Sequence, residues 1–300
     1  MKRFIKNILS FFVVLLILCG KHAYTQVKVQ VVTREISKSI NWEPGLAVWI
    51  QSDRAEIVCS THASNTIDFK VEFVAKNESR KTAEADLKKM KWVNETSGKK
   101  LFLRNYIELE RNEPKPESDI KVIYHIKIPT SCAININNYF GRINIENMNS
   151  ELSIDSEFSK INLQNIDGKL NIKTTFGDIT AHSISGNINI ESIRSDIHLT
   201  KVSGVLELQS KLADIIINDI EEISKIIIDA EKSKINLKIK DYNKFSFNLD
   251  LFKSELAKPD NMKLEYIKNE KETIKASFNQ AVDRPQIDIK LNTGNLTIEP

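Results

Sequence analysis

The chain has 300 residues, 28% of them charged, and a formal net charge of +3 at pH 7. Four of its 43 basic residues and none of its 40 acidic residues lie before residue 26, so the remainder is close to neutral. A near-neutral surface of mixed charge gives no reason to expect a nucleic acid as the partner.

Residues 1–25 have the features of a secretory signal peptide. Three basic residues precede an apolar run from Ile8 to Cys19, which is shorter than the roughly 20 residues of a membrane-spanning helix. Ala23–Thr25 forms a cleavage site before Gln26. We therefore predict an exported protein (periplasmic, on the outer surface or secreted) with no transmembrane helix after cleavage. Cys19 is not expected to carry a lipid, because Leu18 stands where a small residue is required.

Two cysteines remain after removal of the signal peptide, Cys59 and Cys132. An even pair in an oxidising compartment could form one disulfide that closes a long loop. Two buried free thiols are the equal alternative, since neither cysteine has the spacing of a metal or redox motif.

Residues 26–130 are predicted to form a β-rich N-terminal cap with one helix. Residues 78–93 carry apolar side chains at helical spacing and no proline, which predicts the α-helix. A stack of strands needs such a cap because its open end would expose unpaired backbone groups. Alternating apolar residues predict strands over residues 27–32, 46–51, 56–59, 67–74, 101–109 and 120–128.

Residues 131–300 are predicted to form a repeat region, because a small residue recurs every nine positions. The small residues are Gly141, Ser150, Ser159, Gly168, Gly177, Gly186, Ser195, Gly204 and Ala213. Apolar residues follow two and four positions after each, with polar residues between them, as in strands with one buried face. The distance to the next bulky residue alternates between three and four positions, with Ile193 the exception. The complete unit therefore consists of two unlike halves and contains two strands.

A single unit cannot bury its own apolar face, so the units must stack. We predict an all-β fold, a parallel β-solenoid with about 18 residues and two strands per rung. An antiparallel meander is the rival topology, but it would leave one wide sheet with a bare apolar face. The absence of proline between Pro129 and Pro259 fits strands that pair on both sides. The period is interrupted at Glu221–Glu222 and returns at the C terminus, where Ile287 precedes Leu296 by half a unit.

Several short motifs carry a resemblance to a known family. They are Trp42–Leu46 (Trp-Glu-Pro-Gly-Leu), the iterated Gly-x-Ile-x-Ile units and Gly294–Ile298 (Gly-Asn-Leu-Thr-Ile). Together with the signal peptide and the strand–helix–strand segment, they resemble the bacterial putative-adhesin β-strand-repeat family, an exported domain of unknown function. The resemblance implies a cell-envelope protein of β-solenoid type. It implies no site residues, because the family has none that are established.

Three aspartates, Asp178, Asp196 and Asp214, recur once per unit at the same position and should stack as a column of carboxylates. Such a column is a candidate calcium site. The calcium-binding β-roll motif, however, needs Gly-Gly-x-Gly-x-Asp, and Arg142 and Lys160 fall in the same column. We therefore predict solvated turn residues, with no metal and no cofactor.

Other polar and aromatic positions have a structural and a functional interpretation. Phe158 and Phe176 are predicted to fill a corner of the core, with stacking on sugars as the alternative. Outward asparagines are predicted to form short ladders, with a polar binding face as the alternative. These are Asn144, Asn162, Asn171 and Asn189. The histidines are predicted to be ordinary surface residues, namely His62, His125, His182 and His198.

The functional prediction is a non-catalytic exported module of the cell envelope, either adhesin-like or a scaffold, with a surface glycan or an envelope protein as partner. An envelope-stress signalling accessory protein is one alternative. A carbohydrate-active β-helix enzyme is the other, but loops of two to four residues between Tyr139 and Asp219 are too short to wall a deep pocket. We therefore do not expect an enzyme.

Overall fold

The computed structural model describes residues 28–281 and 283–300. The predicted signal peptide, its cleavage site and Cys19 lie outside the described residues. In the part of the chain that is described, no helix is both long enough and apolar enough to cross a membrane.

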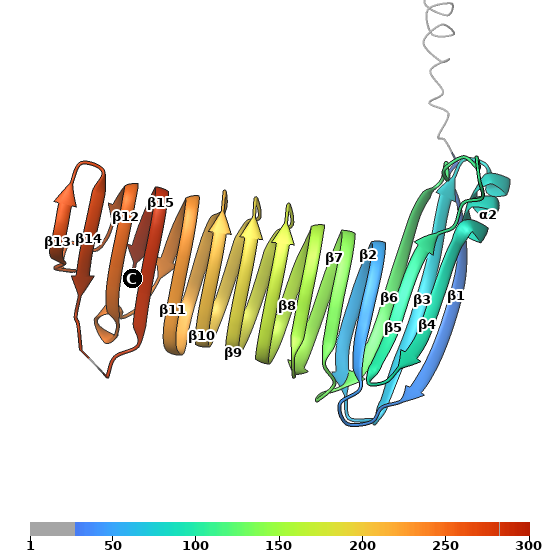
Figure 1. Cartoon of the computed structure of the whole chain (residues 1–300), viewed down its shortest axis with the longest axis horizontal. Helices are drawn as coiled ribbons and strands as arrows, with labels where there is room; N and C mark the ends of the chain where they lie inside the picture. Colours follow the sequence, from blue (N-terminus) through green and yellow to red (C-terminus); the bar gives the residue numbers. More distant parts are fainter. Residues whose placement is uncertain (1–27, 282) are drawn as a thin grey trace, which may run out of the picture.

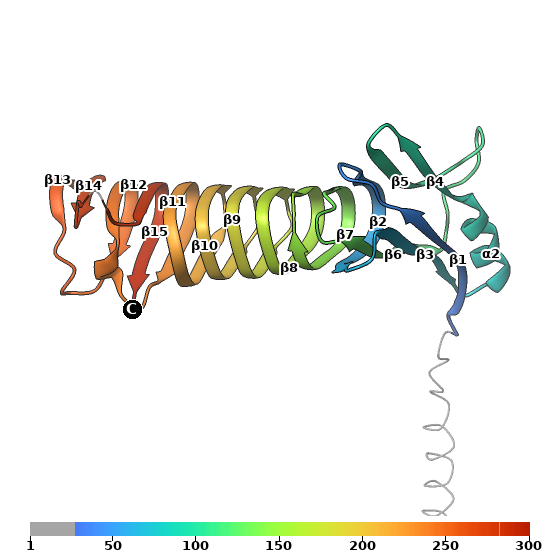
Figure 2. The ribbon, with the colours of Figure 1, turned by 90° about the horizontal axis from the view of Figure 1, so that it is seen from below.

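The described residues form one extended, coiled sheet with fifteen strands (Figures 1 and 2). The strand order is β1-β3-β6-β2-β7-β8-β9-β10-β11-β15-β12-β14-β13, and β5 pairs with both β2 and β4. The N-terminal elements are β1 (Gln30–Asn41), β2 (Ala47–His62), β3 (Thr66–Asn77), α2 (Arg80–Lys89), β4 (Met90–Ser97), β5 (Lys100–Ile107) and β6 (Asp119–Pro129). The elements that follow are β7 (Ile134–Asn149), β8 (Leu152–Thr175), β9 (Ile179–Ile193), β10 (Ile197–Lys211), β11 (Asp214–Lys238), η1 (Tyr242–Lys244), β12 (Ser246–Ala257), β13 (Glu265–Glu270), β14 (Thr273–Phe278) and β15 (Gln286–Glu299).

The repeat unit sets the register between rungs. Ile134 pairs with Leu152 across β7 and β8, and the same offset pairs Ile161 with Ile179 across β8 and β9. All of these pairings are parallel, which confirms the solenoid with two strands per rung and excludes the meander. Between β10 and β11 the register shifts by two positions next to Glu221–Glu222, which is the interruption seen in the sequence.

Both ends of the stack contain segments that are distant in sequence. The first rung is β2, where Val48 pairs with Ile134 of β7 in parallel register, so the stack includes a segment that precedes residue 131. The predicted domain boundary at 130/131 remains a prediction. At the other end, β15 lies between β11 and β12, since Ile287 pairs with both Ile226 and Phe247. Figure 1 shows β15 between β11 and β12. Beyond β12 the sheet continues with β14 and β13, and β14 pairs antiparallel with both β12 and β13.

The core lies inside the coil, where the apolar residues of successive rungs form ladders. Ile161, Ile179 and Ile197 are each at most 1% exposed, and the ladder continues through Ile215. Full burial of an aliphatic side chain of this size stabilises the fold by about 1.5–3 kcal/mol. Because every rung contributes equivalent residues, the core is one continuous column rather than a set of separate clusters.

The helix is shorter than predicted. Ser79 caps its N terminus by accepting a hydrogen bond from the Thr82 amide, and the helix ends at Lys89 instead of Val93. The following residues form β4, a strand that the helical spacing concealed. Trp92 of β4 packs 5.5 Å from the Tyr124 ring, centroid to centroid, so tertiary packing overrides the local helical preference there.

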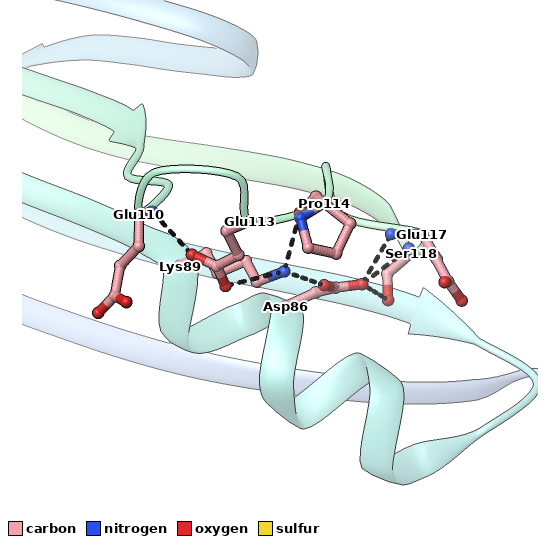
Figure 3. Close-up of polar contacts among 7 residues, drawn as sticks. All are labelled: Asp86, Lys89, Glu110, Glu113, Pro114, Glu117 and Ser118. Atoms are coloured by element: carbon pink, nitrogen blue, oxygen red, sulfur yellow. Dashed lines mark hydrogen bonds and ion pairs between the residues drawn. The ribbon is translucent and has the colours of Figure 1, made fainter.

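Asp86 joins α2 to the loop before β6. Its carboxylate accepts hydrogen bonds from the Ser118 hydroxyl (2.7 Å) and the Ser118 and Glu117 amides (2.9 and 3.0 Å), as Figure 3 shows. Lys89 lies 3.4 Å from Asp86 and 3.2 Å from Glu113, and it donates to the Pro114 carbonyl. Burial alone would raise the pKa of Asp86, but the Ser118 hydrogen bonds and Lys89 together hold that pKa below its usual value.

We expect an alanine at the buried ladder position 197 to destabilise the fold strongly. Ile197→Ala would leave a cavity between two rungs, and the free energy of unfolding should fall by about 2–5 kcal/mol in urea denaturation. Ile216 is the matched control because it is an isoleucine on the outward side of the next rung. Ile216→Ala should cost about 1 kcal/mol or less, and equal losses would contradict the inward assignment.

We expect Asp86→Ala to cost about 1–3 kcal/mol at neutral pH, because it leaves the Ser118 donors buried without an acceptor. The folded-state pKa of Asp86 lies below its usual value, so its contribution is present above about pH 4 and is lost as the pH falls through the folded-state pKa. The free energies of unfolding of the variant and the wild type should therefore converge at acid pH. Urea denaturation at neutral and at acid pH would measure both.

Glu84→Ala on the exposed face of α2 is the control. Glu84 pairs only with Arg80 among the described residues, so its loss should change the free energy of unfolding by roughly 0.5 kcal/mol or less. If the free energy of unfolding of the Asp86→Ala variant differed from that of the wild type by the same amount at every pH, the carboxylate charge of Asp86 would not stabilise the fold.

Candidate interaction surface

Four aromatic side chains line one outer corner of the first rungs. We call Tyr139, Phe140, Phe158 and Phe176 the aromatic column. Tyr139 and Phe140 belong to β7, Phe158 lies in β8, and Phe176 follows β8 directly. They are 42%, 40%, 38% and 43% exposed, respectively. The prediction that Phe158 and Phe176 fill a corner of the core is therefore wrong.

The corner geometry explains why these rings point outward. Phe140, Phe158 and Phe176 all have left-handed backbone conformations, with φ between 51° and 61°. The next residue in each case is the small residue of the repeat, and it lies where successive rungs come closest. A Cβ atom added to Gly141 would lie 1.9 Å from the Ala55 carbonyl oxygen. The small residue lets the rungs approach each other, and the left-handed residue before it turns its ring to the outside of the corner.

The phenylalanine rings stack face to face because the register places them one above another. The centroids of Phe140 and Phe158 are 4.8 Å apart, and those of Phe158 and Phe176 are 5.0 Å apart with planes only 1° from parallel. Tyr139 lies perpendicular to Phe158, and the Arg194 guanidinium lies 5.2 Å from the centroid of Phe176. The ring faces are therefore largely occupied, and the column presents ring edges to solvent.

A first hollow of about 690 Å³ lies on one side of the aromatic column. It forms where the β4–β5 hairpin, which stands out from the coil in Figure 2, meets the outward faces of β2, β7 and β8. Trp49 and Phe102 line it with their centroids 6.2 Å apart, and Tyr106, Asn137 and Asp155 complete much of its wall. We call it the hairpin groove.

A second hollow of about 680 Å³ lies on the other side of the same corner. Phe140 and Phe158 border it, and we call it the basic hollow because four basic residues face two acidic residues there. The basic residues are Arg54, Lys121, Arg142 and Lys160, and the acidic residues are Glu56 and Asp119. The aromatic column thus separates two hollows of different character.

The three aspartates of the predicted column do lie in successive rungs. The Asp196 amide donates to Oδ1 of Asp178 (3.3 Å), and the Asp214 amide donates to Oδ1 of Asp196 (3.1 Å). Lys234 lies 3.9 Å from Asp214. Asp178 and Asp196 therefore accept backbone hydrogen bonds from the next rung. Across the described ranges no group of three or more histidine, cysteine, aspartate or glutamate residues is arranged to hold a metal ion. That the column binds no metal remains a prediction.

The outward asparagines form ladders in part. Asn162 donates to Asn144 at 2.8 Å, as predicted, and Asn165 donates to Asn147 at 2.9 Å in a second ladder that the sequence reasoning missed. Asn171 and Asn189 are neighbours in register. Among the histidines, His198 contacts Asn218 at 3.1 Å on the surface, and His62 is half-buried near Asp68.

Cys59 and Cys132 are both buried and carry free thiols in the structure. Burial raises the pKa of Cys59 well above its usual range, and the neighbouring Cys132 raises it further. Burial raises the pKa of Cys132 to about 11. Whether the two cysteines pair in the exported protein remains a prediction.

Stacked parallel rungs with ladders of equivalent side chains define a solenoid-like repeat protein of the all-β class. Within that class, the chain belongs to the Toastrack DUF4097 family, whose model matches residues 48–299. This confirms the resemblance noted in the sequence. No curated protein matches the chain.

Solved structures that are similar to this chain include the following two. One is described as a putative cell adhesion protein from Clostridium sporogenes ATCC 15579, with 11% identity, a TM-score of 0.24, and coverage of 89% of this chain and 99% of that chain. The other is described as a putative adhesin from Bacteroides fragilis NCTC 9343, with 12% identity, a TM-score of 0.36, and coverage of 89% and 96%. Similarity at this level assigns no function.

We expect the two thiols to resist alkylation in the folded protein. With a pKa of about 11, only about one in 10⁴ Cys132 side chains is a thiolate at pH 7, and both sulfurs are buried. Iodoacetamide without reductant should label neither cysteine in the native chain and both in denaturant, as measured by intact mass. A chain that takes up no label even when unfolded would instead contain the Cys59–Cys132 disulfide.

Proposed function

We propose that this protein is a non-catalytic, exported module of the cell envelope that binds an extended partner at the aromatic column. The observation that carries the proposal is the in-register row of exposed rings between two hollows. Extended surfaces built from stacked repeats are the surfaces that such proteins use for partners.

The exposed apolar area supports a binding role. Arg194 follows Phe176 in the column and covers its outer face, and Ile193 and Leu212 on the rungs beyond are 47% and 39% exposed. Contiguous exposed apolar surface bordered by polar residues is typical of interaction sites, because isolated monomers usually bury it. The stacking of the rings holds them in fixed positions, so little side-chain entropy would be lost when a partner binds.

A glycan chain is the partner that this surface fits best. Aromatic side chains, amides and carboxylates line the hairpin groove together, which is the composition of a site that offers both apolar contact and hydrogen bonds to hydroxyl groups. The column and its two hollows follow consecutive rungs, so the surface is long rather than deep. The alternative partner is an envelope protein that binds through a flat face.

We expect no catalytic role, because several acidic groups of this face already form structural contacts. Asp178 and Asp196 accept backbone hydrogen bonds of the next rung, and Glu56 forms an ion pair with Lys121. Glycoside hydrolysis would instead require two free carboxyl groups that face each other across a bound sugar. In the hairpin groove the carboxyl groups are those of Glu95 and Asp155. We propose that these two bind hydroxyl groups of the glycan without turnover.

We expect removal of the column to weaken binding without unfolding the protein. The double variant Phe158→Ala and Phe176→Ala should lose at least about tenfold in affinity, because the central apolar contacts of an interface carry most of its binding energy. A glycan array and a panel of purified envelope proteins, probed with the chain from Gln26 to Pro300, would identify the partner class. Titration calorimetry would then give the affinities.

Phe252→Ala is the matched control. Phe252 is 42% exposed but lies in β12, at the opposite end of the stack. It should leave binding unchanged. Unaltered binding by the column variant, or binding to nothing in either panel, would contradict the proposed surface. Release of reducing ends from a bound polysaccharide would show that the protein is an enzyme.

A further inference from the structure

We propose that the basic hollow binds the acid groups of an anionic glycan, so that the partner of this module is a polyanion rather than a neutral sugar chain. The inference rests on the proposed function and specifies the ligand class of the same surface. It depends on Arg142, Lys160 and Arg54, and on the edges of the Phe140 and Phe158 rings beside them.

Two like charges lie next to each other in this hollow. Arg142 pairs in register with Lys160, so their backbones are neighbours in the parallel ladder, about 4.8 Å apart. Like charges directly opposite each other destabilise a sheet. Neither side chain forms an ion pair with any residue that the structure describes. A bound anion would remove this repulsion, which gives the folded protein an intrinsic preference for an anionic ligand.

Of the acids close to this pair, Asp119 lines the hollow without an ion pair among the described residues, and two others have partners elsewhere. Glu56 is the register neighbour of Arg142 on the preceding rung, but its carboxylate pairs with Lys121. On the following rung, Asp178 accepts the Asp196 amide. Arg142 and Lys160 are both exposed to solvent, and neither of these two acids pairs with them.

The rings add to the positive character of the hollow. Phe158 is stacked between Phe140 and Phe176, so its electron-rich faces are covered and its edge is exposed. The edge of an aromatic ring is the positive end of its quadrupole. Ring edges beside guanidinium and ammonium groups favour carboxylate, sulfate or phosphate groups over the neutral hydroxyls of a sugar.

The charge pattern along the same face limits where the anion can lie. Beyond Arg142 and Lys160, the next three positions of the column are Asp178, Asp196 and Asp214. Their negative charges would repel a polyanion, so binding is confined to the rungs formed by β2, β7 and β8. From there the chain of sugars would reach the edges of the Phe140 and Phe158 rings. A hollow of about 680 Å³ is within the range of known ligand sites, so its volume is sufficient for a short oligosaccharide segment.

The test is a titration of the chain from Gln26 to Pro300 with four probes: oligogalacturonate, dextran sulfate, neutral dextran and poly-glutamate. We expect the two anionic glycans to bind at least tenfold more tightly than neutral dextran, with an affinity that falls as salt increases. Comparison of the first two probes distinguishes carboxylate from sulfate as the preferred group. Tighter binding to neutral dextran, or equal binding to poly-glutamate, would overturn the proposal.

The double variant Arg142→Gln and Lys160→Gln should lose at least tenfold in affinity for the preferred anionic glycan and most of the salt dependence. Its melting temperature should stay equal or rise, because the repulsion between the two cations is removed. Lys234→Gln is the matched control, since Lys234 occupies the same column but lies near Asp214. It should bind as the wild type does, and an unchanged double variant would overturn the proposal.

The same variants separate this inference from the proposed function. In one outcome, the Phe158 and Phe176 variant loses binding to a neutral glycan or to an envelope protein, and no polyanion binds measurably. That outcome would retain the interaction surface and reject the anionic partner. In the other outcome, the Phe158 and Phe176 variant binds every ligand as the wild type does, while the Arg142 and Lys160 variant still binds more weakly. That outcome would retain the anion site and reject a contribution of the aromatic column to it.

Discussion

The parallel hydrogen-bond register between rungs is the constraint on which the whole structure depends. An offset of one full rung places each residue above its equivalent in the next rung, as Ile161, Ile179 and Ile197 illustrate. A parallel ladder does this for inward and outward positions alike. The same geometry that builds a continuous aliphatic core therefore also builds ladders of identical chemistry on the surface.

Repetition on the surface has favourable and unfavourable results. Phenylalanines stack at 4.8–5.0 Å, and Asn144 and Asn162 share a hydrogen bond. Charged residues stack as well, and like charges repel. The aspartates reduce this cost by accepting amide hydrogen bonds from the following rung. Arg142 and Lys160 form no ion pair with any described residue, and their corner is the most basic part of the aromatic column's surroundings.

The two ends of the coil are completed by strands that leave the repeat. At the N-terminal end, β6, β3 and β1 continue the sheet beyond β2, with antiparallel pairing between β6, β3 and β1 and the helix α2 packed beside them. At the C-terminal end, β14 and β13 pair antiparallel beyond β12. Such strands stop the stacking of further rungs, because an open parallel edge would present unpaired backbone groups. The hairpin groove exists only because the N-terminal end contains the additional β4–β5 hairpin.

The sequence by itself determined the repeat. Alternation of apolar and polar residues and the period of the small residues follow from local chain geometry, so they predicted the solenoid, its register, its inward isoleucines and the interruption at Glu221–Glu222. Only the tertiary structure decided the rest. It turned Met90–Ser97 into a strand, placed β2 within the stack and β15 between β11 and β12, and set Phe158 and Phe176 outside the core. The direction of a corner side chain depends on the left-handed backbone conformation at that residue, which the contacts between rungs fix and a linear pattern does not specify.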